Sequence, residues 1–183
     1  MPLTNSTGRK LSHKRDISCY AYEREDGLWD IEAHMTDAKT FSIMEPFMPP
    51  LKAGDYIHDM WLRITVDKQR TVVAVEAKMD AKPYRECHGG GESLNSLVGL
   101  TITTGFLRKA RARISKQHRC THLAELLGPI GTTAHQALFN VNKEENPVRD
   151  GRDVLNSCYA YSETSELIKR RWPHLHVTVS ADE

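Results

Sequence analysis

The sequence predicts an α+β protein in which an antiparallel sheet of about four strands has helices packed on one face. Three observations predict this class. Apolar and polar residues alternate along four stretches before Asp80, which is the period of a half-buried strand. Turn signals separate these stretches closely enough for hairpins. After Glu92 the apolar residues recur every three or four positions, and strands followed by helices favour a helical layer on one sheet face.

The first two strands are expected to form a hairpin around the turn signal Asp26-Gly27. Alternation begins at residue 16, and the return strand is expected over residues 28–41. One face of the return strand carries Trp29, Ile31, Ala33 and Met35. A proline-rich loop over residues 45–55 then interrupts regular structure.

The third and fourth strands are expected over residues 56–66 and 71–79, on either side of a short polar turn. His58 begins the third strand on the face of its apolar residues, whereas Glu76 in the fourth strand faces away from that strand's apolar side. The expected apolar face of the fourth strand carries Val73, Val75, Ala77 and Met79.

Three helices are expected next, over residues 92–100, residues 106–115 and a run that follows Cys120. Thr121 is the expected N-cap of the last helix, and Gly128-Pro129 is expected to kink it. Cys120 then lies just outside a helix N-terminus, a position that favours the thiolate, the form that binds metal or attacks a substrate.

The organisation expected from the composition is a polar, disordered lead-in (residues 1–14), one α+β metal-site domain (residues 15–141) and a C-terminal extension (residues 142–183). The extension begins with a charged stretch and contains one short helix, expected over residues 163–171.

The composition also restricts the function. The net charge of +1 gives no general attraction for nucleic acid. No apolar run reaches the ~20 residues that span a bilayer, and the polar N-terminus lacks a signal-peptide core, so a cytoplasmic protein with no membrane partner is expected. Walker, GxGxxG and GxSxG motifs are absent from the sequence, which argues against nucleotide-dependent chemistry and a serine hydrolase.

Metal-binding residue types lie where predicted elements begin or end. They are His58 at a strand start, Cys87 and His88 beside three glycines, and Cys120 and His122 before a helix. In a fold with strands before helices these boundaries can converge at one edge of the sheet. His58, Cys87 and Cys120 are therefore the expected ligands, with zinc as the first metal and iron as the second. Asp59 is a candidate ligand or supporting partner, and a catalytic thiol, a structural role or simple burial are the alternatives.

Acid–base candidates come from the polar positions of the strands and from the helix start. His34, Asp37 and Glu76 could face a cleft beside the metal, and His122 could move a proton if it does not bind. Trp29, Trp61 and Tyr84 could line a substrate pocket. A hydrated sheet face and ordinary sheet packing are the corresponding alternatives.

Six short motifs resemble a bacterial family known as domain of unknown function 2889. They are Tyr22 to Asp30 (YEREDGLWD), Thr36 to Lys39 (TDAK), Ile57 to Met60 (IHDM), Pro83 to Cys87 (PYREC), Leu97 to Leu100 (LVGL) and Cys120 to Leu123 (CTHL). The family name implies no activity. The motifs fall within residues 15–140 and leave the last forty or so residues outside the resemblance.

A weaker resemblance is to iron–sulfur scaffold proteins of the NifU/IscU type, which combine a small antiparallel sheet with helices. Those proteins bind zinc or a cluster with three cysteines, and His58, Cys87 and Cys120 occupy the analogous places in this sequence. Histidine in place of the first cysteine favours a mixed nitrogen–sulfur site over a cluster.

The function expected from these observations is that of a metal-dependent lyase or hydrolase. Its substrate would be a small oxygenated molecule, with an aromatic, lignin-derived compound suggested by the aromatic candidates alone. A non-catalytic metal or iron–sulfur carrier is the alternative, and a metal-free binding domain is a third reading. The partner is expected to be a small molecule, and the chain could form a homo-oligomer.

Overall fold

The structure is a computed structural model that describes residues 3–4, 7–139, 141, 151–152 and 154–178. The chain forms two compact units, Met1–Asn140 and Val141–Glu183. The first unit contains the sheet and the helices that cover it. The expected charged stretch over residues 142–153 lies almost wholly outside the described residues.

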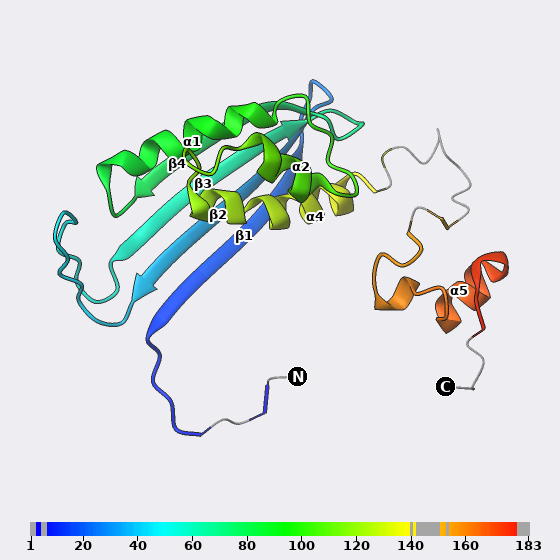
Figure 1. Ribbon diagram of the computed structural model, residues 1–183, viewed down its shortest axis with the longest axis horizontal. Coiled ribbons are helices and arrows are strands. Elements are labelled where there is room, and N and C mark those ends of the chain that lie inside the picture. Colours follow the sequence, from blue (N-terminus) through cyan, green and yellow to red (C-terminus); the bar gives the residue numbers. More distant parts are fainter. Residues whose placement is uncertain (1–2, 5–6, 140, 142–150, 153, 179–183) are drawn as a thin grey trace. The chain divides into compact units, whose positions relative to one another are not determined.

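The first unit is built on a four-stranded antiparallel sheet with the strand order β1-β2-β3-β4 (Figure 1). Its strands are β1 (His13–Glu23), β2 (Trp29–Lys39), β3 (Tyr56–Val66) and β4 (Val72–Ala81). This topology confirms the predicted α+β class and its four strands. β1 begins earlier than expected because His13 pairs with Lys39, so the sheet takes in the last two residues of the expected lead-in.

The apolar face of β4 differs from the expectation at its first residue. Thr65 pairs with Ala74, but Val66 pairs with Val72, so the register shifts between these two pairs. Val73 lies in this irregularity and is 41% exposed, whereas Val72 is buried. Sequence alternation cannot show such a bulge, because one extra residue reverses the faces on either side of it.

Helices pack on one face of the sheet, as predicted. The helix α4 (Leu127–Ala137) lies against β1 and β2, and α3 (Thr121–Glu125) lies against β3. The helix α2 (Phe106–Arg113) packs on α4. The segment after β4 forms three short turns of helix: η1 (Arg85–His88), α1 (Gly89–Glu92) and η2 (Ser93–Leu97), of which α1 and η2 cover β4. These turns begin before the single helix predicted over residues 92–100.

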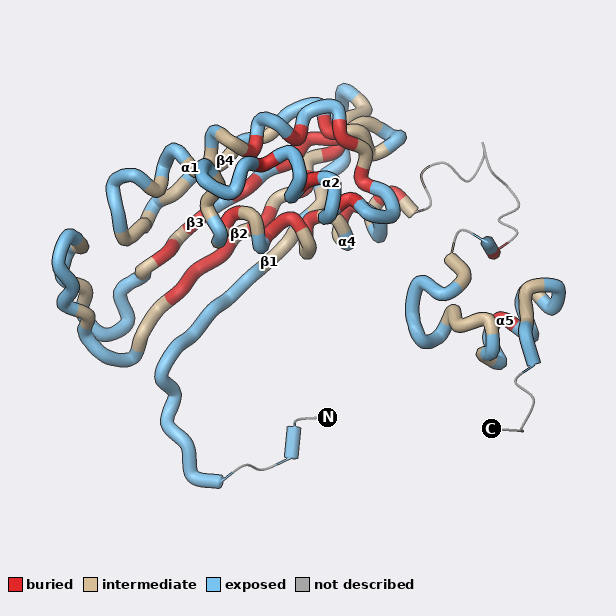
Figure 2. The backbone as a smooth tube through the Cα atoms, viewed as in Figure 1, coloured by how far each residue is buried: buried red, intermediate tan, exposed pale blue. Residues whose placement is uncertain are grey.

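The buried residues lie between the sheet and this helical layer (Figure 2). Burying one large aliphatic side chain contributes about 1.5–3 kcal/mol, so this layer provides most of the stabilising free energy of the unit. The sheet side of the core consists of Ile31, Ala33, Met35, Met60, Leu62 and Ile64, and the helix side contains Leu123, Leu126, Leu127 and Ile130, all at most 1% exposed.

The run after Cys120 is divided into two helices, and the division precedes the predicted kink. Pro129 has no N–H to donate to the carbonyl of Glu125, so α3 ends at Glu125 and α4 restarts at Leu127. The N-cap of α3 is Cys120 rather than Thr121, which is the first helical residue, and the Cys120 side chain makes no capping hydrogen bond. The prediction that Cys120 lies just outside the helix is confirmed.

The second unit contains α5 (Glu166–Arg171) and the 3-10 turns η3 (Tyr159–Tyr161) and η4 (Pro173–Leu175). The Ser165 side chain caps α5 by accepting a hydrogen bond from the backbone N–H of Ile168, and the helix stops before Trp172-Pro173 as predicted. Across the described residues of both units, every helix is too short or too polar to cross a lipid bilayer.

Candidate metal centre

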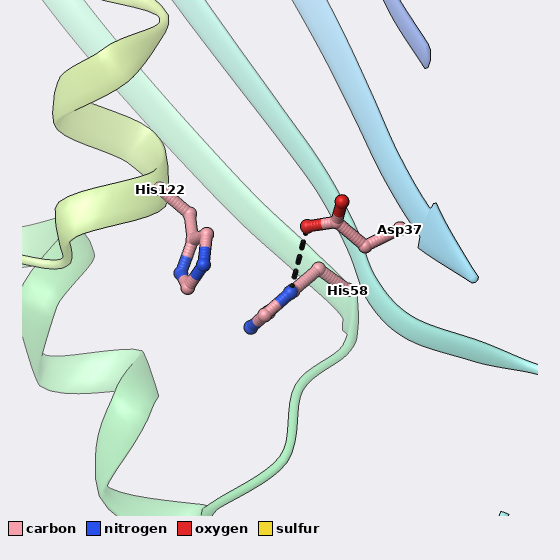
Figure 3. A group of neighbouring side chains, drawn as sticks. All are labelled: Asp37, His58 and His122. Carbon is pink, nitrogen blue, oxygen red and sulfur yellow. Dashed lines mark hydrogen bonds and ion pairs between the residues drawn. The ribbon is translucent and has the colours of Figure 1, made fainter. Parts of the chain in front are cut away.

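Three side chains of types that can bind a metal ion meet beneath the start of α3 at one end of the sheet (Figure 3). Asp37 comes from the end of β2, His58 from the start of β3 and His122 from the second position of α3. One possible ligand atom from each residue lies within 4.8 Å of the other two. Asp37 and His58 are direct partners in the β2–β3 register, which explains why their side chains share the helix-covered face.

The Asp37 carboxylate is buried and each of its oxygens accepts two hydrogen bonds. Arg15 donates from Nε to Oδ1 and from Nη2 to Oδ2, both at 2.8 Å. His13 Nε2 lies 3.0 Å from Oδ1, and His58 Nδ1 lies 2.9 Å from Oδ2. Burial alone would raise the pKa of Asp37, but the hydrogen bonds from Arg15 and His58 outweigh burial and lower the pKa to about 2. Asp37 is therefore an anion with no acceptor position left over.

The two imidazoles of the group are close together and neutral. The ring centroids of His58 and His122 are 3.7 Å apart. Burial lowers the pKa of His58, and the neighbouring His122 lowers it further. Burial also lowers the pKa of His122, with a further contribution from Arg15. Because Nδ1 of His58 donates to Asp37, the lone pair of His58 is on Nε2, and a neutral imidazole is the form that binds metal.

Arg15 connects the three elements that carry the group. Its guanidinium makes two hydrogen bonds to Asp37, and its Nη1 donates to Oε2 of Glu125 in α3 at 2.7 Å. Arg15 itself belongs to β1, where it pairs with Asp37. One side chain thus fixes the carboxylate behind His58 and the helix that carries His122.

The predicted cysteine ligands lie in the neighbouring segments but outside the three-residue group. Cys87 belongs to η1, and Cys120 is the N-cap of α3. Gly90 of α1, three residues after Cys87, packs on Cys120, since a Cβ atom added at Gly90 would lie 2.6 Å from the backbone nitrogen of Cys120. His88, the other ligand type of this loop, has its Nδ1 atom 3.0 Å from the carbonyl oxygen of Arg85.

Four other predicted site residues lie on the opposite face of the sheet. The Asp59 carboxylate lies 2.6 Å from Nε2 of His34, whose ring stacks on Trp61 with centroids 3.8 Å apart. Glu76 accepts a hydrogen bond from Arg63 at 2.8 Å. Successive side chains of a strand point to opposite faces, so Asp59 cannot support its neighbour His58. The expectation of one site that joins Asp59, His34, Trp61 and Glu76 to His58 is corrected accordingly.

The remaining aromatic candidates lie at opposite ends of the sheet. Trp29 begins β2, pairs with Val66 and is 9% exposed, so it belongs to the core far along the strand from Asp37. Tyr84 lines a cavity of about 560 Å³. Two further lining residues, Tyr56 and Ile57, directly precede His58 in β3, so this cavity lies at the same end of the sheet as the candidate centre. The other lining residues include Phe47, Met48, Leu51, Lys82 and Arg85.

Sequence reasoning recognised His58 and His122 but gave Asp37 an acid–base role among the polar positions of the sheet. Strand alternation could have placed Asp37 on the buried face. Asp37 continues the odd-numbered series of Trp29, Ile31, Ala33 and Met35, whose side chains face the helices. Arg15 and His13 gave no signal, since they lie at the edge of the expected lead-in.

Comparison with known proteins identifies one family. The model of the family described as "Protein of unknown function (DUF2889)" matches residues 13–136, which include the whole sheet and the candidate centre. No curated protein and no solved structure matches the chain. The likeness to the NifU/IscU type therefore stays an expectation. Since the match covers more than half of the sequence, the chain belongs to the DUF2889 family.

Proposed function

We propose that the protein is a metal-dependent enzyme, a lyase or hydrolase that acts on a small oxygenated molecule. The observation that carries the proposal is the pair of the buried His58 and the half-buried His122, with His58 oriented by Asp37. A carboxylate behind a histidine is the usual support of a metal-binding imidazole. The chemistry of these donors therefore fits a divalent metal ion.

The ligand set that we propose begins with the imidazole nitrogens of His58 and His122. Asp37 acts behind His58 rather than on the metal, because Arg15 and His58 would have to release its oxygens first. The proposed sulfur ligands are Cys120 and Cys87, which precedes by three residues the Gly90 that packs on Cys120. Nitrogen and sulfur donors together suit zinc, with iron as the second choice.

Each residue near the centre has a task in this proposal. When bound, the metal would polarise a substrate oxygen or activate water. Asp37 holds His58 in one tautomer, and Arg15 keeps Asp37 ionised while fixing α3 through Glu125. If His122 does not bind the metal, its low pKa makes it a proton acceptor at neutral pH. His34 and Glu76 take no part, because they lie on the other face.

The cavity at the His58 end of the sheet supports the choice of substrate. Its volume of about 560 Å³ lies in the usual range for small-molecule sites. Phe47, Tyr56 and Tyr84 contribute aromatic surface, and Lys82, Arg85 and Asp80 contribute charges of both signs. We therefore propose a small aromatic substrate, and a lignin-derived compound is one example of this class.

Turnover of a panel of small aromatic alcohols, aldehydes and esters tests the proposal. Treatment with a chelator should abolish activity and added zinc or iron(II) should restore it. The variant His58→Gln should be inactive, whereas His34→Gln, which changes the histidine on the opposite face, should retain activity. Metal bound without turnover of any compound, or a brown iron–sulfur absorption, would instead identify a carrier.

A further inference from the structure

The open face of the sheet, opposite the helical layer, carries side chains that the candidate metal centre does not use. The described helices of the first unit pack on the other face (Figure 1). Cross-strand partners share one face of a sheet, so each set of partners in β2, β3 and β4 forms a row on it. Two such rows on the open face are His34, Trp61 and Lys78, and beside them Glu32, Arg63 and Glu76.

Trp61 is held in a fixed orientation with one ring face free. His34 stacks on the other face, with ring centroids 3.8 Å apart and ring planes 7° from parallel. The Asp59 carboxylate holds the His34 ring in turn, since it lies 2.6 Å from Nε2. Because His34 belongs to β2, the free face of the Trp61 ring is turned toward β4, where Lys78 is its partner.

A cavity of about 370 Å³ lies on this side of Trp61. Its volume is in the usual range for small-molecule sites. Asp80 also lines the cavity at the His58 end of the sheet, but Trp61, Glu32 and Glu76 do not. Trp61 is the aromatic wall of the smaller cavity, and its charged lining residues are Glu32, Arg63, Glu76, Lys78 and Asp80.

The charges in this cavity are paired with one another. Arg63 donates hydrogen bonds to Glu32 at 2.7 Å and to Glu76 at 2.8 Å. Nζ of Lys78 lies 2.8 Å from the Asp80 carboxylate. An anionic ligand would meet three carboxylates against two cations, and a cationic ligand would compete with Arg63 and Lys78 for the same carboxylates. The lining therefore favours a neutral ligand.

Hydroxyl groups suit this lining better than other neutral groups. A ligand that fills the cavity displaces water from the charged side chains and must replace its hydrogen bonds. A hydroxyl group both donates and accepts, so it can satisfy the carboxylates and the cations alike. The free face of Trp61 needs an apolar surface against it. A sugar ring offers both, because C–H groups form one face and hydroxyl groups surround its rim.

We propose that the open face of the sheet holds a second binding site, for a neutral mono- or disaccharide. The C–H face of one sugar ring lies on Trp61, and its hydroxyl groups bind Glu32, Arg63 and Glu76. This site and the candidate metal centre lie on opposite faces of the sheet. Sugar binding therefore needs no metal and does not depend on the proposed enzymatic activity.

Nuclear magnetic resonance titration of the full chain tests the proposal. The probes are glucose, galactose, mannose, xylose and disaccharides of these sugars. At least one probe should shift the indole N–H signal of Trp61 and amide signals of β3 and β4, and the shifts should saturate. The metal-centre variant His58→Gln should bind the same sugar with the same dissociation constant.

Trp61→Ala should raise the dissociation constant of that sugar roughly tenfold, because it removes the surface under the ring. The matched control is Tyr22→Ala. Tyr22 is also an exposed aromatic residue of the open face, at 49% against 36% for Trp61, but it does not line the cavity. Tyr22→Ala should bind the sugar as the wild type does.

Glu76→Gln tests the polar side of the site in a variant that is expected to fold. Glu76 is exposed, and Arg63 keeps its hydrogen bond to Glu32 when the Glu76 carboxylate is lost. Sugar binding should weaken several-fold. The control is Asp16→Asn, which neutralises a carboxylate of the same face that is paired with Lys14 outside the cavity. This variant should bind as the wild type does.

A wild type in which none of these sugars shifts the Trp61 signal would overturn the proposal. Sugar binding that Trp61→Ala and Glu76→Gln both leave unchanged would overturn it too, as would equal losses in Trp61→Ala and Tyr22→Ala. Choline and benzoate serve as charged probes. If either binds beside Trp61 more tightly than every sugar, the assignment to a neutral ligand is wrong.

Discussion

Asp37 is the residue that organises the candidate centre. Its carboxylate meets donors from His13, Arg15 and His58, and it is only 1% exposed. A buried carboxylate is stable only when such partners offset the loss of hydration. The same contacts fix the tautomer of His58, so the stability of the fold and the proposed metal binding depend on one side chain.

Replacing Asp37 by Asn tests that role. The amide is nearly the same size but neutral, so His58 loses the anionic partner that orients it and makes it a stronger ligand. Metal affinity should fall roughly 10- to 100-fold, the usual effect of removing such a partner. Competition with a coloured chelator measures this change.

The matched control is Asp59→Asn, since Asp59 also contacts a strand histidine, His34, but on the opposite face. Metal affinity should be unchanged in that variant. Equal losses in both variants would mean that the effect is not specific to the centre.

The dependence of stability on pH follows from the low pKa of Asp37. Its pKa is lowered from 3.8 to about 2, so the native state favours the ionised form. The resulting stability is present above pH ~4 and is lost as the pH falls toward ~2, and it amounts to about 2 kcal/mol. Urea unfolding of chelator-treated protein should show this loss in the wild type and a shallower one in Asp37→Asn. Identical acid profiles for the two proteins would contradict the assignment.

The histidines act in a higher pH range. Because burial lowers the pKa of His58 and of His122, both favour the neutral form in the folded protein. Their contribution to the free energy of unfolding is complete above the ordinary histidine pKa of about 6.5. It is lost as the pH falls from there through the lowered pKa values of the two histidines in the folded protein. Chelator-treated protein should therefore begin to lose stability below pH ~6.5. The variant His58→Gln should lose less over this range, and an unchanged slope would argue against a buried, neutral His58.

At the scale of elements, α1, which follows the turn that carries Cys87, is in contact with Cys120 at the start of α3. A Cβ atom at Gly90 would lie 2.6 Å from the backbone nitrogen of Cys120, too close for any side chain. Gly90→Ala should therefore push the two segments apart and destabilise the fold by about 1–3 kcal/mol. Thermal unfolding measures the effect.

Gly89→Ala is the control for this substitution. Gly89 is the neighbouring residue of α1, and a Cβ atom there would meet nothing within 4 Å. Alanine favours helix, so this variant should be as stable as the wild type or slightly more stable. Equal behaviour of the two alanine variants would contradict the close packing at Gly90.

The elements differ in how far the sequence could predict them. The bounds of β3 were predicted to the residue, because Met60, Leu62, Ile64 and Val66 recur at every second position up to its end. The bulge beside Val73 was not predicted, because it depends on a register shift between β3 and β4. The break between α3 and α4 at Leu126 was not predicted either, because it depends on the hydrogen bond that Pro129 cannot donate to Glu125.

The same reasoning applies to the candidate site. His58 was found because it shares the alternation of β3, and His122 because it precedes a clear helical period. The sequence named Cys87 and Cys120 as their companions but could not show that both lie outside the three-residue group, because the path of residues 82–100 depends on packing against β4 and α3. The separation of His34 and Asp59 from His58 could have been predicted from strand alternation alone.

At the scale of the whole molecule, the chain divides into two units, and the candidate centre lies entirely in the first. A chain that ends at residue 140 should therefore keep its sheet and bind metal with wild-type affinity. Circular dichroism and metal titration of the shortened protein test this. Loss of metal binding in a folded short chain would show that residues 141–183 contribute to the centre.

The central claim is that His58 and His122 bind a metal ion, and metal content measured by mass spectrometry tests it most directly. Wild-type protein and His34→Gln should each carry one zinc or iron per chain after dialysis. His58→Gln should carry almost none, and His122→Gln should carry much less than the wild type, while both keep the wild-type circular dichroism spectrum. A wild-type protein without metal after growth with added zinc and iron, or a folded His58→Gln variant with full metal content, would contradict the account.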